Sequence, residues 1–377
     1  MQLDMHYYGT YALARAAGLA PEDCRIISTA AQFVDDNAGK DTVWFKDGAR
    51  LDVDATAHHT YDMVANLDPE DQRQVWVPFH FIPGNQGQEY TERLICRKDS
   101  AIAREMVDHH VALSAKRYYV PLIGITAHVY ADTFSHYGFS GVSSRKNRIE
   151  GDSLRIVNSE RLDDDLQQHI DDQAKKFRQR YGREGGFLPN IKRWWRSVKS
   201  ESAELGSGAL GHGAVLTFPD RPYLHWEFRY ENTNGENREA VQNRDNPATF
   251  LEAAEALHAM FSRAREFLDN DGADTGRPWG DIAERVKEII ETPGRKRERI
   301  DHWQTAAQSG DLYAGAGKQI PAYEDHDWDE QREQLAHNRE DSSGVLDKPV
   351  FQFYQAAAAH RVYVLRDLLP AHGLLAD

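Results

Sequence analysis

The sequence has little cysteine, no long apolar run and no signal-like N-terminus. Only Cys24 and Cys96 occur in its 377 residues, which excludes a disulfide framework and a four-cysteine zinc site. No stretch approaches the roughly 20 apolar residues of a membrane-spanning helix. The first residues also lack the basic and apolar regions of a signal peptide. We therefore predict a cytoplasmic location by default, with signal-independent export as an effector as the alternative.

Basic charge is also in short supply. The chain has 45 Lys and Arg residues against 60 Asp and Glu residues, a net charge of −15. Such a balance argues against binding nucleic acid or an anionic membrane through bulk charge. Residues 231–377 carry −11 of this charge and residues 1–230 carry only −4. The net charge therefore does not exclude an anionic substrate bound by the first 230 residues.

The sequence contains no Gly-rich phosphate loop, no dinucleotide-binding fingerprint and no internal repeat. Its hydrophobic periodicity is mostly helical. We predict a mainly α fold, a multi-helix bundle with a small β-hairpin at residues 42–54 and additional C-terminal helices. The predicted helices cover residues 8–34 with a break near Gly18, 99–117, 119–136, 159–182, 190–204, 247–270, 277–292 and 349–369.

The segments between these helices are predicted to be irregular. Residues 75–83 are expected to be extended, and residues 309–348 to form an acidic loop. For domain organisation, we predict a metal-binding helical domain at residues 1–230 and a helical extension at residues 231–377 packed on it. One single domain is the alternative.

The strongest chemical signal lies in the apolar segment 119–136, which contains His128, Asp132 and His136. Residues four apart lie on one face of an α-helix, about 6 Å apart along its axis. The two histidines are then about 12 Å apart, too far to share one ion, and the carboxylate lies between them. We interpret Asp132 as a bridging ligand between two metal ions. The alternative is a pair of core histidines with a buried acceptor, but three such groups on one apolar helix are costly to bury without cations.

Other residues with metal-binding side chains flank this helix, and each is a weak signal when taken singly. An acidic pair can simply end a helix, and a histidine pair can lie in an exposed loop. The candidates are Asp4, His6, Asp35, Asp36, His58, His59, His212 and Asp220.

The order of these candidates along the chain resembles that in the zinc-dependent phospholipase C and single-strand-specific zinc nuclease superfamily. Its members are all-α and bind three zinc ions. Residues 1–230 also resemble, more closely, an uncharacterised bacterial metal-binding family that is distantly similar to this superfamily. The strings that carry the closer resemblance are Gln32–Asp36, Val77–Gly84, His128–Thr133, His136–Gly141 and Gly211–Tyr223.

The resemblance implies Zn2+ as the cofactor, with two or three ions in up to three pockets. These are Asp35, His58 and His128 with Asp132; His6, the N-terminal segment and Asp132; and His136 and His212 with a carboxylate. The superfamily uses the free N-terminus of a processed chain as a ligand, and Asp4 is the expected substitute here. It also has a glutamate four residues after the late histidine, where this chain has Leu216, so Asp220 is the nearest carboxylate.

The implied activity is hydrolysis of a phosphodiester, either a phospholipid or another one. Paired metal ions about 3.5–4 Å apart can clamp such a group and activate a water molecule. Asp35 or Asp36 is the expected general base, with Asp132 as the bridging carboxylate. The sequence leaves open which of Asp35 and Asp36, and which of His58 and His59, binds metal.

Three further interpretations stay open at this point. A basic segment containing Trp194 and Trp195 can lie on a phospholipid surface or stack on bases, although a core Trp is slightly favoured. A zinc nuclease or nucleotide phosphohydrolase is the enzymatic alternative, although an HD-type site would need His326-Asp327, which lies in an acidic stretch. The non-enzymatic alternative is a helical interaction protein with structural metals.

Overall fold

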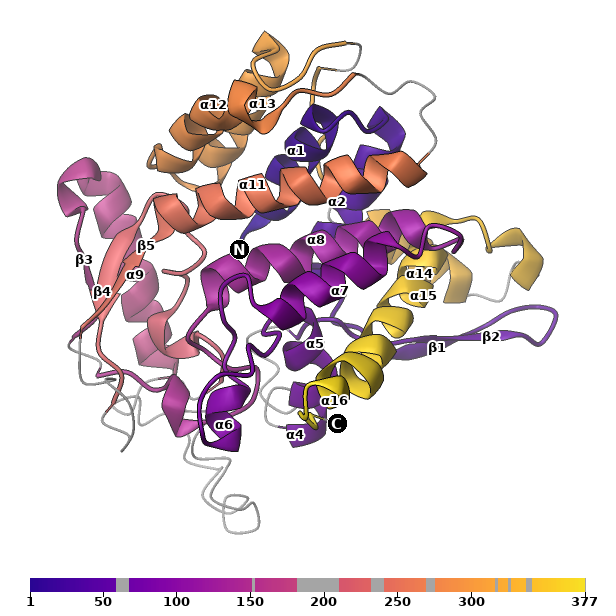
Figure 1. Cartoon of the computed structure of the whole chain (residues 1–377), viewed down its shortest axis with the longest axis horizontal. Helices are drawn as coiled ribbons and strands as arrows, with labels where there is room; N and C mark the ends of the chain where they lie inside the picture. Colours follow the sequence, from indigo (N-terminus) through magenta and orange to yellow (C-terminus); the bar gives the residue numbers. More distant parts are fainter. Residues whose placement is uncertain are drawn as a thin grey trace.

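A computed structural model describes residues 1–58, 68–150, 153–181, 210–231, 241–268, 275–315, 318–324, 327–336 and 341–376 of the chain. The fold is mainly α, as predicted, and its described residues include two small antiparallel sheets (Figure 1). Within these residues, no helix has the length and apolar character needed to cross a bilayer. Trp194 and Trp195 lie outside the described residues.

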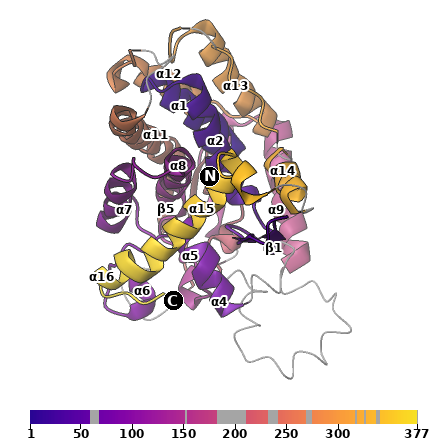
Figure 2. The same cartoon turned by 90° about the vertical axis from the view of Figure 1, so that its right-hand side faces the viewer.

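Helix α8 (Tyr119–His136) lies at the centre of the bundle (Figures 1 and 2). It packs against α2 (Pro21–Asp36), α7 (Ala101–Val111), α11 (Asn246–Ala264) and α15 (Pro349–Val362). Almost every residue of α8 is buried, as its apolar sequence predicts. Polar side chains on this helix must therefore find their partners inside the protein.

The closest approach to α8 is made by α2, at Gly124. A Cβ atom at this position would lie 2.3 Å from the carbonyl oxygen of Ile27 and 2.6 Å from the Cβ of Ala30. The absence of a side chain therefore lets the two helices pack closely. This packing brings Asp35, near the C-terminal end of α2, to within 3.9 Å of His128 on α8.

The predicted hairpin is confirmed. Strand β1 (Asp41–Trp44) pairs antiparallel with β2 (Arg50–Val53), so that Asp41 lies opposite Val53. The turn contains Gly48 at a φ of 85°, a left-handed conformation that favours glycine.

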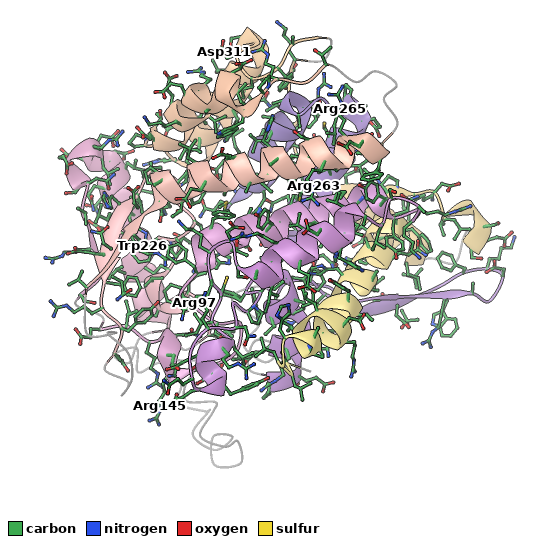
Figure 3. The ribbon with its side chains drawn as sticks, in the orientation of Figure 1. Arg97, Arg145, Trp226, Arg263, Arg265 and Asp311 are labelled. Carbon is green, nitrogen blue, oxygen red and sulfur yellow. The ribbon has the colours of Figure 1, made fainter. Side chains whose placement is uncertain are left out.

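A second sheet is not anticipated by the sequence pattern. It consists of β3 (Arg155–Ile156), β4 (His225–Phe228) and β5 (Gln242–Asp245), with β4 in the middle. Trp226, labelled in Figure 3, is fully buried on β4 and stacks on Phe228 at 5.1 Å. These strands are very short, so their alternation is too brief to stand out in the sequence.

The other helices flank this core. Figure 1 shows α12 and α13 beside α1 and α11 at one end of the bundle, and α14, α15 and α16 at another side. Single π-helical turns occur at Asp4–Gly9, Gln72–Trp76 and Tyr363–Leu368. The remaining bounds are α1 (Thr10–Ala16), α4 (Pro69–Asp71), α5 (Val77–Phe79), α6 (Tyr90–Arg93), α9 (Asp164–Tyr181), α12 (Trp279–Glu291), α13 (Lys296–Ser309), α14 (Asp327–Ala336) and α16 (Leu369–Ala371).

The prediction of extended structure at residues 75–83 is wrong for its first half. The π-helical turn Gln72–Trp76 continues into α5, and the helix ends only at His80. Pro78 has no backbone N–H to donate, so it interrupts the regular α-helical hydrogen-bond ladder, and the wider π-helical turn lies directly before it. The apolar run reflects burial on all sides, which periodicity alone does not distinguish from a buried strand.

The prediction of a loop throughout residues 309–348 is also wrong in part, because α14 forms there. Trp328 of α14 is buried, with its ring 5.3 Å from that of Phe33 and 5.5 Å from that of Phe353. Most residues of α14 are charged or polar, so its one buried aromatic side chain, Trp328, does not give a clear hydrophobic pattern in the sequence.

The two predicted parts of the chain share structure. The larger hydrophobic core contains residues from Met1 to Ala376, and β4 and β5 pair with each other across the expected boundary at residue 230. The core and this strand pairing therefore contain residues from both predicted parts of the chain.

Candidate metal centre

The three candidate ligands on α8 lie on one buried face, as their spacing predicts. His128, Asp132 and His136 are 0%, 1% and 4% exposed. Asp132 Oδ2 lies 3.2 Å from His128 Nε2 and 3.4 Å from His136 Nδ1. The carboxylate therefore lies between the two histidines, with its Oδ2 near a ring nitrogen of each.

Three other segments direct nitrogen atoms at Asp132. His80, just after α5, places its Nδ1 3.3 Å from Asp132 Oδ2. His6, in the π-helical turn Asp4–Gly9, places its Nε2 3.2 Å from Asp132 Oδ1, and the amine of Met1 lies 2.6 Å from the same oxygen. Asp132 is therefore the centre of the cluster.

Asp35 completes the groups around His80, His128 and His6. Its Oδ1 lies 3.8 Å from His80 Nδ1 and 3.9 Å from His128 Nε2, and its Oδ2 lies 3.9 Å from His6 Nε2. The rings of His6 and His128 stack at 3.9 Å. Two sets of potential ligand atoms converge here, one of His80, His128 and Asp132 and one of His6, Asp35 and His128.

A third group lies at the other end of α8. Asp220 Oδ1 is 3.2 Å from His136 Nε2, and Asp220 Oδ2 is 3.7 Å from His212 Nε2. The amine of Met1 lies 3.4 Å from Asp220 Oδ1 and so links this group to the first two. The structure thus brings together the His136, His212 and Asp220 set that the resemblance implies.

Four of the five histidines are oriented by backbone carbonyl groups. Each donates one ring N–H to a carbonyl oxygen, which fixes its tautomer and leaves a lone pair on the other nitrogen. The acceptors, at 2.7 to 3.0 Å, are Ala31 for His128, Thr56 for His80, His80 for His136 and Leu216 for His212.

The free nitrogen of His128, and likewise that of His80, points at Asp132, and those of His136 and His212 point at Asp220. A lone pair facing a carboxylate oxygen is unfavourable unless a proton or a cation lies between them. Both ring nitrogens of His6 are buried without a hydrogen-bond partner among the described residues. The described residues therefore form groups that could hold metal ions.

The pKa values indicate that the imidazoles of His6, His128 and His212 are neutral. Burial lowers the pKa of His128 and that of His212 to about 4. Burial, with the nearby His128 and amine charges, lowers the pKa of His6 well below its usual value. Partial burial and the charge of Asp132 raise the pKa of Asp35 well above its usual value. At neutral pH these three rings therefore carry no second proton that could separate their lone pairs from the carboxylates.

Two predicted ligands lie outside the cluster. Asp4 faces away from it and accepts hydrogen bonds from Arg299 at 2.7 and 3.0 Å, so it does not replace the amine. That correction follows because a buried carboxylate pairs with a buried guanidinium. His58 places its Nε2 3.7 Å from Asp71 instead of facing Asp35, and His80 stands in its predicted place.

Asp36 adjoins the cluster but is engaged elsewhere. It accepts hydrogen bonds from Tyr323 Oη at 2.6 Å and from Gln32 Nε2 at 3.3 Å. The structure therefore favours Asp35 over Asp36 as the carboxylate that faces the histidines. His59 lies outside the described residues.

Sequence reasoning did not assign His80 as a metal ligand, and it expected Asp4 in place of the N-terminal amine. His80 lies in the string Val77–Gly84 that carries the resemblance, so its position was a usable signal. Two adjacent histidines at residues 58 and 59 were the more conspicuous pattern. Whether this pair or His80 lies beside Asp132 depends on the long-range packing of α5 against α8, which the spacing of residues in the sequence does not reveal.

Comparison with known proteins identifies a family. Residues 1–368 match the family of unknown function DUF6765, and the chain belongs to that family. No curated protein matches the chain. No solved structure matches it either.

Proposed function

We propose that this member of a family of unknown function is a zinc-dependent phosphodiester hydrolase with a three-ion centre. The proposal is carried by one observation: histidine nitrogens and carboxylate oxygens face one another in three adjacent groups, and most of these side chains are buried. The lone pairs of these nitrogens and oxygens repel one another, and divalent cations between them would be coordinated by both.

The donor set favours zinc. Imidazole nitrogen and carboxylate oxygen are common zinc ligands, whereas calcium and magnesium prefer oxygen alone. The groups offer two to four protein ligands each, which leaves room for a non-protein ligand, as in catalytic zinc sites. The proposed ligands are Asp35, His80, His128 and Asp132 for one ion; His6 and Asp132, beside the amine of Met1, for the second; and His136, His212 and Asp220 for the third.

When bound, zinc ions polarise phosphoryl oxygens and make water nucleophilic at neutral pH. Asp35 is the most accessible carboxylate of the cluster, because its side chain is 33% exposed against 1% for Asp132 and 9% for Asp220. It is placed to accept a proton from water that enters from solvent.

The test is metal content together with hydrolysis. We expect the purified full chain to contain zinc in stoichiometric amount and to hydrolyse bis(p-nitrophenyl) phosphate, with loss of activity on chelation and recovery on adding zinc. A phospholipid, a single-stranded oligonucleotide and a cyclic nucleotide then distinguish the substrate classes. The phospholipid is the substrate we propose first, following the resemblance.

Matched variants distinguish a catalytic role of the bound metals from a purely structural role. Asp132→Asn keeps the size of the side chain but removes the bridging charge, and His58→Ala is the control because His58 is buried outside the cluster. Loss of hydrolysis in a folded Asp132→Asn chain, with His58→Ala active, supports catalysis. A metal-free wild-type chain contradicts the proposal, and a zinc-loaded chain inactive on every diester supports structural metals instead.

A further inference from the structure

Three buried arginines from the last part of the chain bind segments that carry the candidate ligands. They are Arg244 on β5, Arg299 on α13 and Arg361 on α15, with 4%, 3% and 8% exposure. Figure 1 shows these three elements on different sides of α8. Burying a guanidinium is costly, so each must be matched by well-placed acceptors.

Arg299 binds the N-terminal segment. Its Nε donates to Asp4 Oδ2 at 2.7 Å, and its Nη2 donates to Asp4 Oδ1 at 3.0 Å and to Gln2 Oε1. Its Nη1 donates to the carbonyl of Gly294 at 3.0 Å. These bonds hold Gln2 and Asp4, which lie shortly before His6 in the chain. The ion pair between Arg299 and Asp4 therefore fixes the position of His6, two residues after Asp4.

Arg361 binds the segments that orient His80. Its Nε donates to the carbonyl of Gln74 at 2.8 Å, in the π-helical turn that leads to α5. Its Nη1 and Nη2 donate to Asp54 Oδ2 at 2.9 Å and to the carbonyl of Ala55 at 2.5 Å. Ala55 directly precedes Thr56, whose carbonyl accepts the ring N–H of His80.

Arg244 binds the C-terminal end of α8. Its Nη2 donates to the carbonyl of Ser135 at 2.9 Å, and its Nη1 donates to the carbonyl of Tyr137 at 2.7 Å. These two carbonyls flank His136. The guanidinium also lies over the ring of Tyr137 at 3.3 Å, a cation–π contact that adds to the fixation.

We propose that Arg299, Arg361 and Arg244 are positioning residues, each of which holds one ligand-bearing segment and so controls a different ion of the centre. Arg299 controls the ion at His6, Arg361 the ion at His80 and Arg244 the ion at His136. The inference rests on the proposed metal centre. It also gives the last part of the chain a function, because all three arginines come from it.

The chemistry of the arginine side chain suits a residue that holds a backbone segment in place. A guanidinium presents five N–H donors in a rigid plane and can bind two or three acceptors at once, which a lysine ammonium on a flexible stem does not reproduce. Arg→Lys keeps the charge but releases part of each segment. Outer residues that orient metal ligands typically change metal affinity by about 10–100-fold when they are replaced.

The experiment measures zinc affinity by chelator competition for the full chain and its Arg299→Lys, Arg361→Lys and Arg244→Lys variants. Cadmium NMR of the substituted protein resolves the individual ions, assigned by the signals that His6→Ala, His80→Ala and His212→Ala remove. Arg15→Lys is the control, because Arg15 is 1% exposed and donates to the carbonyl of Leu19, away from the ligands. Unfolding of each chelated chain reports its stability without metal.

We expect each of the three variants to lose affinity for its own ion by about 10–100-fold while the other signals persist. Asp4→Asn should reproduce Arg299→Lys in weaker form, which keeps the test valid if the lysine variant folds poorly. Arg15→Lys should lower the stability without releasing any ion.

Two results overturn the inference alone. One is wild-type zinc affinity in all three lysine variants, and the other is equal loss of every ion in each variant and in Arg15→Lys. A wild-type chain that binds no zinc contradicts the proposed function itself, and the inference with it.

Discussion

Two groups of buried or half-buried histidines in this protein differ in how their hydrogen bonds balance. In the candidate metal centre, imidazole nitrogens point at the carboxylates of Asp132 and Asp220. In a second group, the histidine chain of His109, His110 and His360, the rings bond to one another and no carboxylate takes part in these bonds.

The histidine chain can be satisfied without any ion. His360 Nε2 donates to the carbonyl of Pro78 at 2.9 Å, so its Nδ1 accepts from His110 Nε2 at 3.0 Å. The other nitrogen of His110 then accepts from His109 Nδ1 at 3.1 Å. Every N–H in this path has an acceptor with a lone pair. Histidine number therefore does not identify a metal site, whereas unmatched lone pairs facing carboxylates do.

The largest effect is expected from Asp132→Asn. An amide cannot carry the charge shared by the first two ion groups, so we expect zinc to be lost from both. Hydrolysis should fall by more than about 100-fold, the upper range for outer residues of a metal site. Elemental analysis and the diester assay measure this. His110→Phe is the control and should keep both zinc and activity, whereas equal losses would contradict the distinction between the two groups.

The next effect compares His80→Ala with His58→Ala. His80 contacts Asp132 at 3.3 Å, while His58 faces Asp71 at 3.7 Å. We expect His80→Ala to lose one ion and most activity, and His58→Ala to keep both. The opposite result would restore the ligand assignment based on the sequence alone.

Metal removal should destabilise the protein. An ion present at about a thousandfold excess over its Kd adds about 4 kcal/mol to the free energy of unfolding. We expect chelation to lower the Tm strongly, and to the same extent in wild type and in His360→Phe. A Tm that does not change on chelation would count against ions at the buried carboxylates.

His360→Phe should cost less. It leaves the N–H of His110 and the carbonyl of Pro78 without their partner, which typically costs about 1–3 kcal/mol. Urea unfolding of the zinc-loaded chain measures this, with zinc content unchanged. A loss of zinc in this variant would show that the histidine chain supports the centre directly.

The smallest effect is a pH dependence. Burial lowers the pKa of His360 to about 4, so the unfolded chain binds a proton at higher pH than the folded one. This contribution to stability is complete above the usual histidine pKa near 6.5 and is lost as the pH falls toward 4. We expect the free energy of unfolding of the His360→Phe variant to change less with pH than that of the wild type, by roughly 1 kcal/mol between pH 7 and 5.5. Urea titrations of chelated protein measure this. Identical pH profiles would indicate that His360 is protonated when buried.

The sequence predicts those features of the centre that depend on local geometry. The spacing of His128, Asp132 and His136 follows from the helix repeat, and the structure places all three on one buried face. The mainly α fold and the hairpin follow from periodicity and turn residues in the same way.

Features that depend on distant contacts could not be predicted. Asp4 pairs with Arg299 across 295 residues of sequence, and Arg361 binds Ala55 across 306 residues. Whether His58 or His80 reaches Asp132 depends on how α5 packs on α8. The resemblance implied the order of the candidate ligands along the chain, but the packing of α5 determines that His80, and not His58, lies beside Asp132.

Anomalous diffraction at the zinc edge, from crystals grown without added chelator, tests the central claim most directly. The account predicts three peaks, two beside Asp132 and one between His136, His212 and Asp220, and none along the histidine chain. Absence of any peak at Asp132, or a peak between His110 and His360, would contradict it.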